Sequence, residues 1–264
     1  MTFLLLAGLA TVMATMFVVW IISVKIGNAG IVDVAWSALF AILAAIYAVF
    51  GHGDPQRRII ASLLMILWSL RLALHLGRRV LGHIETEDAR YAELRKSWGA
   101  KADRRMLAFF LFQGITNVVL SVPIALVAVN PRPGLGILEW LGIALWVVAL
   151  AGESIADAQL HRFKQDMANG GAVCDVGLWR YSRHPNYFFE WLVWCAYFLF
   201  ALGSPWGWIS FYCPLLMLWF LYKVTGIPAT EAHSLQTRGE AYRQYQQRTS
   251  AFVPWFPKKS EVSR

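Results

Sequence analysis

Long apolar runs follow one another along almost the whole chain. A helix needs roughly 20 consecutive apolar residues to cross the hydrocarbon core of a bilayer. Runs of this kind lie at about residues 3–24, 30–51, 59–78, 107–129, 136–156, 188–203 and 207–224. Only residues 203–206, with the sequence Gly-Ser-Pro-Trp, separate the last two, which predicts a tight turn between paired helices. The pattern predicts an all-α, polytopic integral membrane protein with about seven transmembrane helices and a single domain over residues 1–264.

The composition supports this interpretation, because 58 % of the residues are hydrophobic and only 15 % are charged. The first apolar run is too long for a signal-peptide core and no small-residue cleavage site follows it. We therefore expect it to be a retained transmembrane helix.

Positive charge is distributed unevenly between the segments that join the runs. Lysines and arginines crowd the two long loops and the C-terminal tail, whereas the opposite loops hold only Arg57, Arg58 and Arg132. The positive-inside rule then places the long loops and the C-terminus in the cytoplasm and the N-terminus outside. Arg57 and Arg58 are the pair that runs against this bias.

The net charge of +8 follows mainly from this cytoplasmic face and from its attraction to anionic lipids. The chain has no motif for binding nucleic acid, which excludes that class of partner. Its cysteines, Cys174, Cys195 and Cys213, form no CxxC pair, so neither a disulfide framework nor a metal site is expected.

One polar stretch, residues 177–190, lies directly before an apolar run. It contains two arginines, a histidine, an asparagine, two tyrosines and a glutamate. Polar groups at the edge of a bilayer are costly and commonly mark a ligand site. These residue types suit an anionic, nucleotide-like ligand. The alternative is a basic collar that anchors a helix end at the lipid surface.

Two further polar groups lie near the first long loop. Arg71, His75 and Arg79 recur at intervals of four, which puts them on one helical face that we expect to point inward. Residues 85–95 are strongly charged and favour a helix, either as a solvated surface helix or as part of a ligand site.

Several polar residues lie inside apolar runs, on the cytoplasmic half of the predicted bundle. Gln113 and Asn117 are typical of hydrogen bonding between membrane helices. Carboxylates need a partner or a water-filled cavity there. These residues, which we expect to line one cavity open to the cytosol, are Asp33, Trp36, Gln113, Thr116, Asn117, Glu153 and Asp157.

The segment Arg183-His184-Pro185-Asn186-Tyr187, followed by Glu231, Gly239, Tyr242 and Tyr245, resembles a cofactor signature shared by two sets of membrane enzymes. One set comprises steroid 5α-reductases and sterol C14 and C7 reductases, which use NADPH. The other comprises isoprenylcysteine and phospholipid methyltransferases, which use S-adenosylmethionine. Asp33, Trp36, the residue 70–79 column and residues 87–91 are similar to the bacterial branch of 5α-reductase-like proteins, over about residues 30–256.

This resemblance implies a cofactor site for NADPH on the cytoplasmic side. Residues 1–106 would form the substrate-side helices and first cytoplasmic loop, and residues 107–264 the cofactor-binding half with the C-terminal tail. The implied cofactor-binding residues are Asp88, Arg90, Tyr91, Asp157, Lys164, Arg183, His184, Asn186, Tyr187, Glu231, Arg238, Tyr242 and Tyr245.

The substrate half departs from the family pattern. The Gln-Glu pair that holds the steroid 3-keto group in the animal enzymes is absent, and Leu76 occupies the position of their tyrosine. The candidate catalytic residues are Asp33, His75 and Glu190, and the candidate substrate contacts are Trp36 and Gln113.

The expected activity is NADPH-dependent reduction of an activated carbon–carbon double bond in the bacterial inner membrane. The substrate would be a steroid or lipid-like enone that enters from the bilayer, most plausibly the Δ4 bond of a 3-oxo-steroid. An S-adenosylmethionine-dependent lipid or isoprenylcysteine-type methyltransferase is the second hypothesis, and a non-catalytic lipid-binding or transport protein is the third. Beyond membrane lipids, the sequence names no protein partner and leaves the oligomeric state open.

Overall fold

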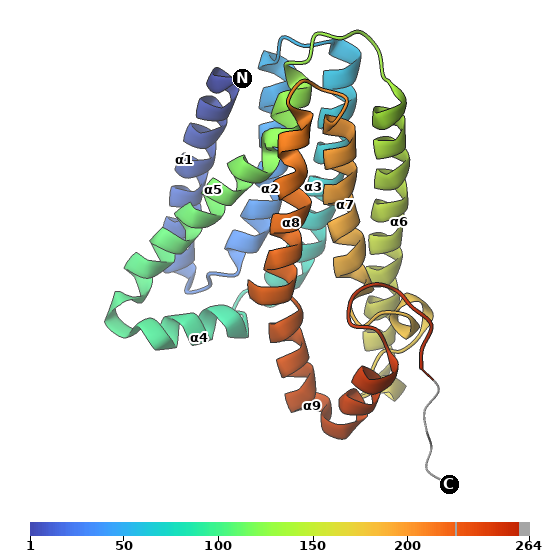
Figure 1. The fold of residues 1–264 in the computed structure, drawn as a ribbon. Helices are drawn as coiled ribbons and strands as arrows, with labels where there is room; N and C mark the ends of the chain where they lie inside the picture. The colour runs from blue at the N-terminus through green and yellow to red at the C-terminus, as the bar shows by residue number, and fades with distance from the viewer. Residues whose placement is uncertain (225, 259–264) are drawn as a thin grey trace. The chain divides into compact units, whose positions relative to one another are not determined.

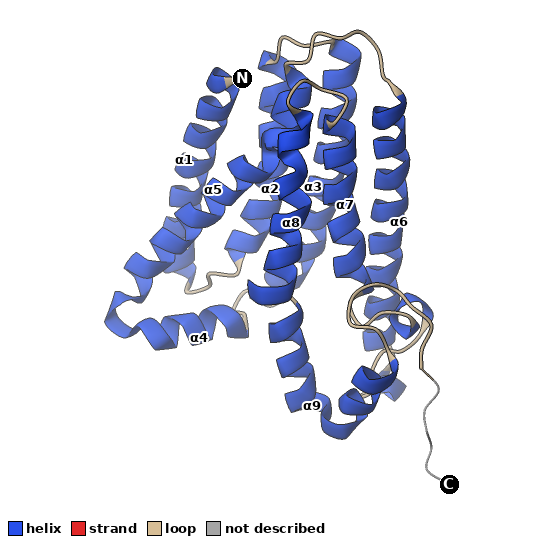
Figure 2. Cartoon of the chain, in the orientation of Figure 1, coloured by secondary structure: helices blue, strands red, loops and turns tan. Residues whose placement is uncertain are grey.

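The computed structural model describes residues 1–224 and 226–258. Helices joined by loops make up this part of the chain, and no strand occurs within it (Figure 2). A single isolated bridge joins Ser182 to Ser250. The predicted all-α fold class is therefore confirmed.

Six helical segments are long and apolar enough to cross a membrane (Figure 1). The run expected at 188–203 forms the helix α7, Pro185–Ala201, whose 17 residues make it shorter than these six. The six segments are those of a multi-pass membrane protein. They are α1 (Thr2–Ile26), α2 (Ile31–Phe50), α3 (Pro55–Leu81), α4 and α5 together (Ala89–Ala128), α6 (Ile137–Gln165) and the segment Gly207–Arg248.

The two longest of these segments are composite. In the first, α4 (Ala89–Trp98) and α5 (Ala102–Ala128) are joined by a 3₁₀ turn, Gly99–Lys101. The second contains the 3₁₀ turn η4 (Gly207–Phe211), α8 (Tyr212–Trp219), the π-turn η5 (Phe220–Val224) and the polar helix α9 (Ile227–Arg248). Only its part before α9 is apolar, so we treat α9 as lying outside the membrane-spanning segments.

Residues at the helix ends explain several boundaries. Gly27 ends α1 in a left-handed conformation, with φ at 70°, which glycine adopts without a steric cost. Asp54 caps α3 by accepting a hydrogen bond from the Arg57 amide, and Pro55 occupies the first helical position. Asp88 caps α4 in the same way, through the Arg90 amide.

The chain forms two compact units, residues 1–139 with 200–210, and residues 140–199 with those from 211 onward. Within the first unit, α5 packs against α1, α2 and α3.

In the first unit, polar side chains join neighbouring helices. The Ser69 hydroxyl of α3 donates to the Ser37 carbonyl of α2 over 2.5 Å. Asn117 of α5 donates to the Trp36 carbonyl of α2 over 2.9 Å, as predicted for hydrogen bonding between membrane helices. Aliphatic and aromatic side chains fill the space between these contacts, among them Phe40, Leu43, Met65, Phe110 and Leu120.

Arg57 and Glu139 form a buried ion pair in the same unit. The Arg57 guanidinium also donates to the carbonyls of Gly134, over 2.6 Å, and Gly203, over 3.2 Å. Arg58 donates to the carbonyl of Gly51, directly after α2. Both arginines that run against the predicted charge bias are therefore bound to the protein rather than to solvent.

In the second unit, α6 and α7 lie antiparallel in a register that two hydrogen bonds fix. Trp146 donates to the Tyr197 hydroxyl over 3.1 Å, and Asn186 donates to the Asp157 carboxylate over 3.3 Å. The helices approach closely at Gly152, where a Cβ atom would overlap the Phe189 ring.

Candidate functional site

The polar stretch before α7 is held against α6 by its own backbone. Gly177 has φ at 57°, and a Cβ there would overlap the Gln159 side chain. Gln159 accepts a hydrogen bond from the Leu178 amide over 2.9 Å, and Trp179 donates its ring N–H to the Ala156 carbonyl over 2.9 Å. The loop therefore enters α7 from a fixed position.

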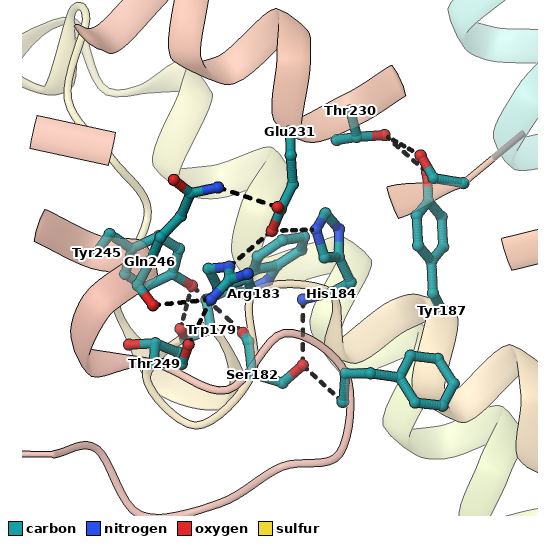
Figure 3. A network of polar contacts seen from close by, with 12 residues as sticks. Trp179, Ser182, Arg183, His184, Tyr187, Thr230, Glu231, Tyr245, Gln246 and Thr249 are labelled. Atoms are coloured by element: carbon teal, nitrogen blue, oxygen red, sulfur yellow. Dashed lines mark hydrogen bonds and ion pairs between the residues drawn. The ribbon is translucent and has the colours of Figure 1, made fainter. Parts of the chain in front are cut away.

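Arg183 lies at the centre of a network that we call the motif cluster: Arg183, His184, Glu231, Gln246 and Thr249 (Figure 3). Its Nε donates to Glu231 over 2.7 Å. Its Nη1 donates to the carbonyls of Gln246, over 3.0 Å, and Thr249, over 2.7 Å. These contacts join the entrance of α7 to the end of α9, so Arg183 fixes the chain fold at this point.

Glu231 is the acidic member of the motif cluster. One oxygen lies 3.3 Å from the His184 ring and accepts from Arg183, and the other accepts from Gln246 over 3.0 Å. Burial acts to raise the pKa of this carboxyl, but hydrogen bonds from His184 and Arg183 and their positive charge lower it to about 2. Glu231 is therefore ionised at any physiological pH.

The chain after α9 returns to the polar stretch as an extended strap, residues 249–255. The Arg183 amide donates to the Ser250 carbonyl over 2.8 Å, and the Ser182 hydroxyl donates to the Phe252 carbonyl over 2.8 Å. The Trp255 amide donates to the Tyr181 carbonyl over 2.9 Å. These long-range bonds make the strap one wall of the motif cluster.

Tyr242 and Tyr245 lie on one face of α9, as their spacing predicted, and both are buried. Gly239, with φ at 51°, kinks α9 just before them. The Tyr245 hydroxyl donates to the Trp179 carbonyl. The tyrosine pair therefore lies in the part of α9 that follows the kink, where Tyr245 bonds to the loop that carries Arg183.

Asn186 and Tyr187 occupy the first turn of α7. The Tyr187 ring stacks on the His184 ring, with centroids 5.3 Å apart and planes 5° from parallel, and its hydroxyl lies 3.2 Å from that of Thr230. The Asn186 side-chain oxygen is buried, and no described residue donates a hydrogen bond to it. An acceptor of this kind suits an amide N–H from a ligand.

The implied phosphate-binding cations lie beside the same loop. Lys164 and Arg238 both act electrostatically on the thiol of Cys174, although burial, the larger effect, raises the pKa of that thiol. Arg238 uses its Nε to donate to the Ala172 carbonyl over 3.0 Å. Two of the predicted cofactor-binding cations are therefore brought together from opposite ends of the second unit's sequence.

Glu190 lies one turn after Asn186 and is buried. It accepts a hydrogen bond from the Trp194 ring N–H over 3.1 Å. Glu153 is also buried, four residues before Asp157 on α6. Since Asp157 lies opposite Asn186, the antiparallel register puts Glu153 at the level of Glu190.

The first unit contains a second polar network, the Asp33 cluster: Asp33, Asp88, Arg90 and Tyr91. Asp33 accepts from the Tyr91 hydroxyl over 2.6 Å and from Arg90 over 2.9 Å. Arg90 also donates to Asp88 over 2.9 Å and 3.1 Å. Asp33 is therefore an acceptor in its contacts with both Tyr91 and Arg90.

Asp88 is partly exposed in this cluster. Burial acts to raise the pKa of its carboxyl, but the hydrogen bonds and charge of Arg90, with a contribution from Arg79, lower the pKa below its usual value. Arg79 lies 3.9 Å from Asp33 and 3.7 Å from Asp88, which is outside hydrogen-bonding distance, and its side chain is 52 % exposed.

Arg79 faces a cavity of about 390 Å³ at the end of α3. The cavity is enclosed by the α1–α2 turn, the end of α3 and the loop before α4, through Asn28, Gly30, Val80, His83, Thr86, Glu87 and Asp88. The inward orientation predicted for the Arg71, His75 and Arg79 column is only partly matched, since His75 and Arg79 are exposed.

Residues 19–249 match a family described as a protein of unknown function, DUF1295. The chain belongs to the DUF1295 family. It is similar to the uncharacterized protein C594.04c of Schizosaccharomyces pombe, with 27 % identity over 271 residues, which cover 90 % of this chain and 76 % of the yeast protein. No solved structure matches the chain. Neither printed description names a reaction.

In this DUF1295 member, the predicted site residues fall into separate networks. The second unit brings together Arg183, His184 and Glu231, with Tyr245 bonded to the same loop. The first brings Asp33 to Asp88, Arg90 and Tyr91, and the candidate substrate contact Trp36 donates to Thr116 over 3.1 Å, one turn from Gln113.

Sequence reasoning missed the strap and Gln246. The strap contributes mostly backbone carbonyls, which no motif reveals. Gln246 follows Tyr242 by four residues, so its place on the buried face of α9 was the one available signal.

Proposed function

We propose that this chain is an NADPH-dependent membrane reductase of an activated carbon–carbon double bond, of the steroid 5α-reductase type. The observation that carries the proposal is the convergence of the Arg183–Tyr187 motif with Asp157 and Glu231. Arg183 and Glu231 are 48 positions apart in the sequence, yet they form one network at the entrance of α7. The most plausible substrate is the Δ4 bond of a 3-oxo-steroid, which the apolar helices could admit from the bilayer.

The residues of the second unit fit a dinucleotide. The buried Asn186 oxygen is an acceptor for the carboxamide N–H of a nicotinamide, with Glu190 one turn further along α7. The terminal amino groups of Arg238 and the Lys164 ammonium suit the phosphates. Since Arg183 is already bonded to Glu231 and two carbonyls, we assign it a positioning role rather than a direct phosphate contact.

NADPH, when bound, supplies the hydride that reduces the β carbon of the enone. The chain's own contribution is to orient the ligands, exclude water and stabilise charge that develops on the substrate oxygen. Within the first unit, Asp33 is the acceptor that fixes Tyr91 and Arg90, and Arg79 keeps donors that no described residue uses at hydrogen-bonding distance.

The proposal includes seven spans, with α7 as the short one, an outside N-terminus and cytoplasmic long loops and C-terminus, in a bacterial inner membrane. The ion pair of Arg57 with Glu139 supports this orientation, because it cancels the charge of Arg57 on the outer face. Arg58 donates to the Gly51 carbonyl and keeps its positive charge there.

The second candidate is an S-adenosylmethionine-dependent lipid methyltransferase. One observation favours keeping it: the signature arginine, Arg183, makes its contacts within the protein, so the motif cluster by itself does not require a pyrophosphate. The cations of the Asp33 cluster and of the Arg79 cavity support our choice of the reductase, because a methyl donor without phosphates has no use for further cations.

A ligand titration tests the proposal. Purified chain in detergent is titrated separately with NADPH and S-adenosylmethionine while thermal unfolding is recorded, since a ligand that binds only the folded state raises the midpoint. We expect NADPH alone to raise it, and Asn186→Leu to abolish the rise. Tyr181→Phe is the control, as its ring is exposed and packs edge-on against Phe256. A rise of the unfolding midpoint with S-adenosylmethionine alone would contradict the reductase proposal and favour the methyltransferase.

A further inference from the structure

An exposed aromatic surface lies on the strap, on Phe256 directly after it and on the loop before α7. Trp255 is 69 % exposed and Phe256 is 78 % exposed. Val253 and Tyr181 beside them are also exposed. We call these four residues the aromatic patch. Large apolar side chains gathered outside the spanning helices mark an interaction surface.

The aromatic patch is rigidly connected to the protein. Trp255 donates its amide to the Tyr181 carbonyl over 2.9 Å, and the Phe256 ring meets the Tyr181 ring edge-on at 6.1 Å. Pro254 and Pro257 flank the two aromatic residues and fix their backbone. Presenting the patch to a partner therefore costs little conformational entropy.

A groove of about 290 Å³ runs beside the patch, between the end of α9 and the strap. Trp255 and Phe256 form its apolar wall. Its opposite wall is polar, with Arg248, Thr249 and Lys258. The Lys258 amide donates to the Arg248 carbonyl over 2.9 Å, which joins the two residues through their backbones. The Arg248 guanidinium is paired with Asp175.

We propose that the aromatic patch and this groove bind the headgroup region of an anionic phospholipid. Tryptophan and tyrosine favour the boundary between headgroups and acyl chains, and lysine and arginine attract anionic lipid. The groove would hold a headgroup phosphate beside Lys258, with the patch entering the boundary layer; Arg248 is already paired with Asp175. The occupant is a lipid because a chain with six apolar helical segments lies in a bilayer, and its cationic groove complements an anionic surface.

Lipid binding here acts on the motif cluster through the strap. The Ser250 and Phe252 carbonyls, which accept hydrogen bonds from Arg183 and Ser182, belong to the segment that carries Val253 and Trp255 of the aromatic patch. Docking of the patch therefore holds one wall of the motif cluster in place. This role is independent of which cofactor the cluster binds.

The test is quenching of Trp255 fluorescence in the full chain, reconstituted in phosphatidylcholine nanodiscs with and without phosphatidylglycerol. The Trp255 signal is the difference between the wild-type chain and Trp255→Phe. Lipids brominated near the headgroup report contact with the bilayer, and aqueous iodide reports contact with water. We expect brominated lipid to remove most of the Trp255 signal, with a larger loss when phosphatidylglycerol is present. Lys258→Glu should abolish the extra loss.

Trp219→Phe is the matched control, because Trp219 is exposed on α8 and should be quenched by brominated lipid in every disc. Quenching of Trp255 by iodide but not by brominated lipid overturns the proposal. Protection from both quenchers also overturns it, since a protein surface would then cover the patch. If quenching by brominated lipid is the same with and without phosphatidylglycerol, the patch does not bind an anionic headgroup and that part of the proposal is wrong. None of these outcomes depends on NADPH.

Discussion

The Asp33 cluster and the motif cluster contain similar residue types but are built differently. In the Asp33 cluster, three of the four residues lie between positions 88 and 91, and carboxylates accept all the bonds. In the motif cluster, Arg183 reaches residues 48 to 66 positions away, and two of its three acceptors are backbone carbonyls. Its side chain is 11 % exposed, against 39 % for Arg90.

This difference separates two roles for arginine. A half-exposed ion pair contributes little to stability, because water screens it and solvates either partner alone. A nearly buried arginine bonded to carbonyls closes the chain fold, and removing it leaves acceptors and a carboxylate without a donor. Substitutions in the motif cluster should therefore lower the stability of the fold, whereas substitutions in the Asp33 cluster should mainly weaken ligand binding.

Arg183→Ala should produce the largest loss. Removing the cation leaves Glu231 in a largely buried position with a weaker partner, and such removal costs about 3 kcal/mol of folding free energy or more. The measurement is thermal and denaturant unfolding in detergent. Arg180→Ala, at an exposed neighbour, is the control and should unfold like the wild-type chain. An unchanged unfolding midpoint in Arg183→Ala would show that the motif cluster contributes no more to stability than the Asp33 cluster does.

Acid should weaken the same ion pair. The pKa of Glu231 is about 2 in the folded chain, against an ordinary 4.5, so the unfolded chain takes up the proton first as pH falls. The stabilisation is complete above about pH 4.5 and is lost as pH falls toward 2. Glu231→Gln should show a smaller fall in unfolding midpoint over this range. Equal pH dependence of the two proteins would show that the ion pair contributes nothing.

Gly239→Ala should have an intermediate effect. Gly239 has φ at 51° and ψ at −122°, which a residue with a Cβ adopts only with strain of about 1–3 kcal/mol. The variant should unfold at lower temperature and lose NADPH-induced stabilisation, because the kink directs Tyr242 and Tyr245 to the motif cluster. Gly170→Ala, at negative φ, is the matched control. Full stability in Gly239→Ala would mean that the kink can straighten freely.

Arg90→Ala should have the smallest effect on stability, about 1 kcal/mol or less, because the pair is partly exposed and Asp33 keeps its hydrogen bond from Tyr91. Its effect on ligand binding should be larger, with the NADPH dissociation constant raised at least about tenfold, or about 1.4 kcal/mol. Arg78→Ala, at an exposed position on α3, is the control for a general loss of charge. A tenfold loss in both variants would indicate screening of the whole face rather than a specific contact.

Much of the helical fold could be predicted from the apolar runs, because the length of a run and the absence of charge are local properties. Six of the seven runs form segments long enough to span, and the turn at residues 203–206 lies where Gly-Ser-Pro-Trp predicted it. The unit boundary could not be predicted, because it depends on α5 packing against α1 and α2, which the apolar pattern of α5 does not specify.

Residues could be selected from the sequence where the residue type itself carries the chemistry. The structure pairs Arg183 with Glu231 and buries Tyr242 and Tyr245, and their role in binding a cofactor stays a prediction. Their partners were not predictable, since the Thr249 and Phe252 carbonyls belong to every residue alike. For the same reason, the sequence could not show that Arg183 makes its hydrogen bonds within the protein, whereas Arg79 has no described partner at hydrogen-bonding distance.

The most direct measurement of the central claim is isotope transfer. Membranes containing the chain are incubated with a 3-oxo-Δ4-steroid and NADPH that carries deuterium at the transferable position, and the product is examined by mass spectrometry and NMR. The account predicts a saturated product with deuterium on the former β carbon, and none from Asn186→Leu. Unlabelled, unreduced steroid in membranes whose chain is folded and stabilised by S-adenosylmethionine would contradict it.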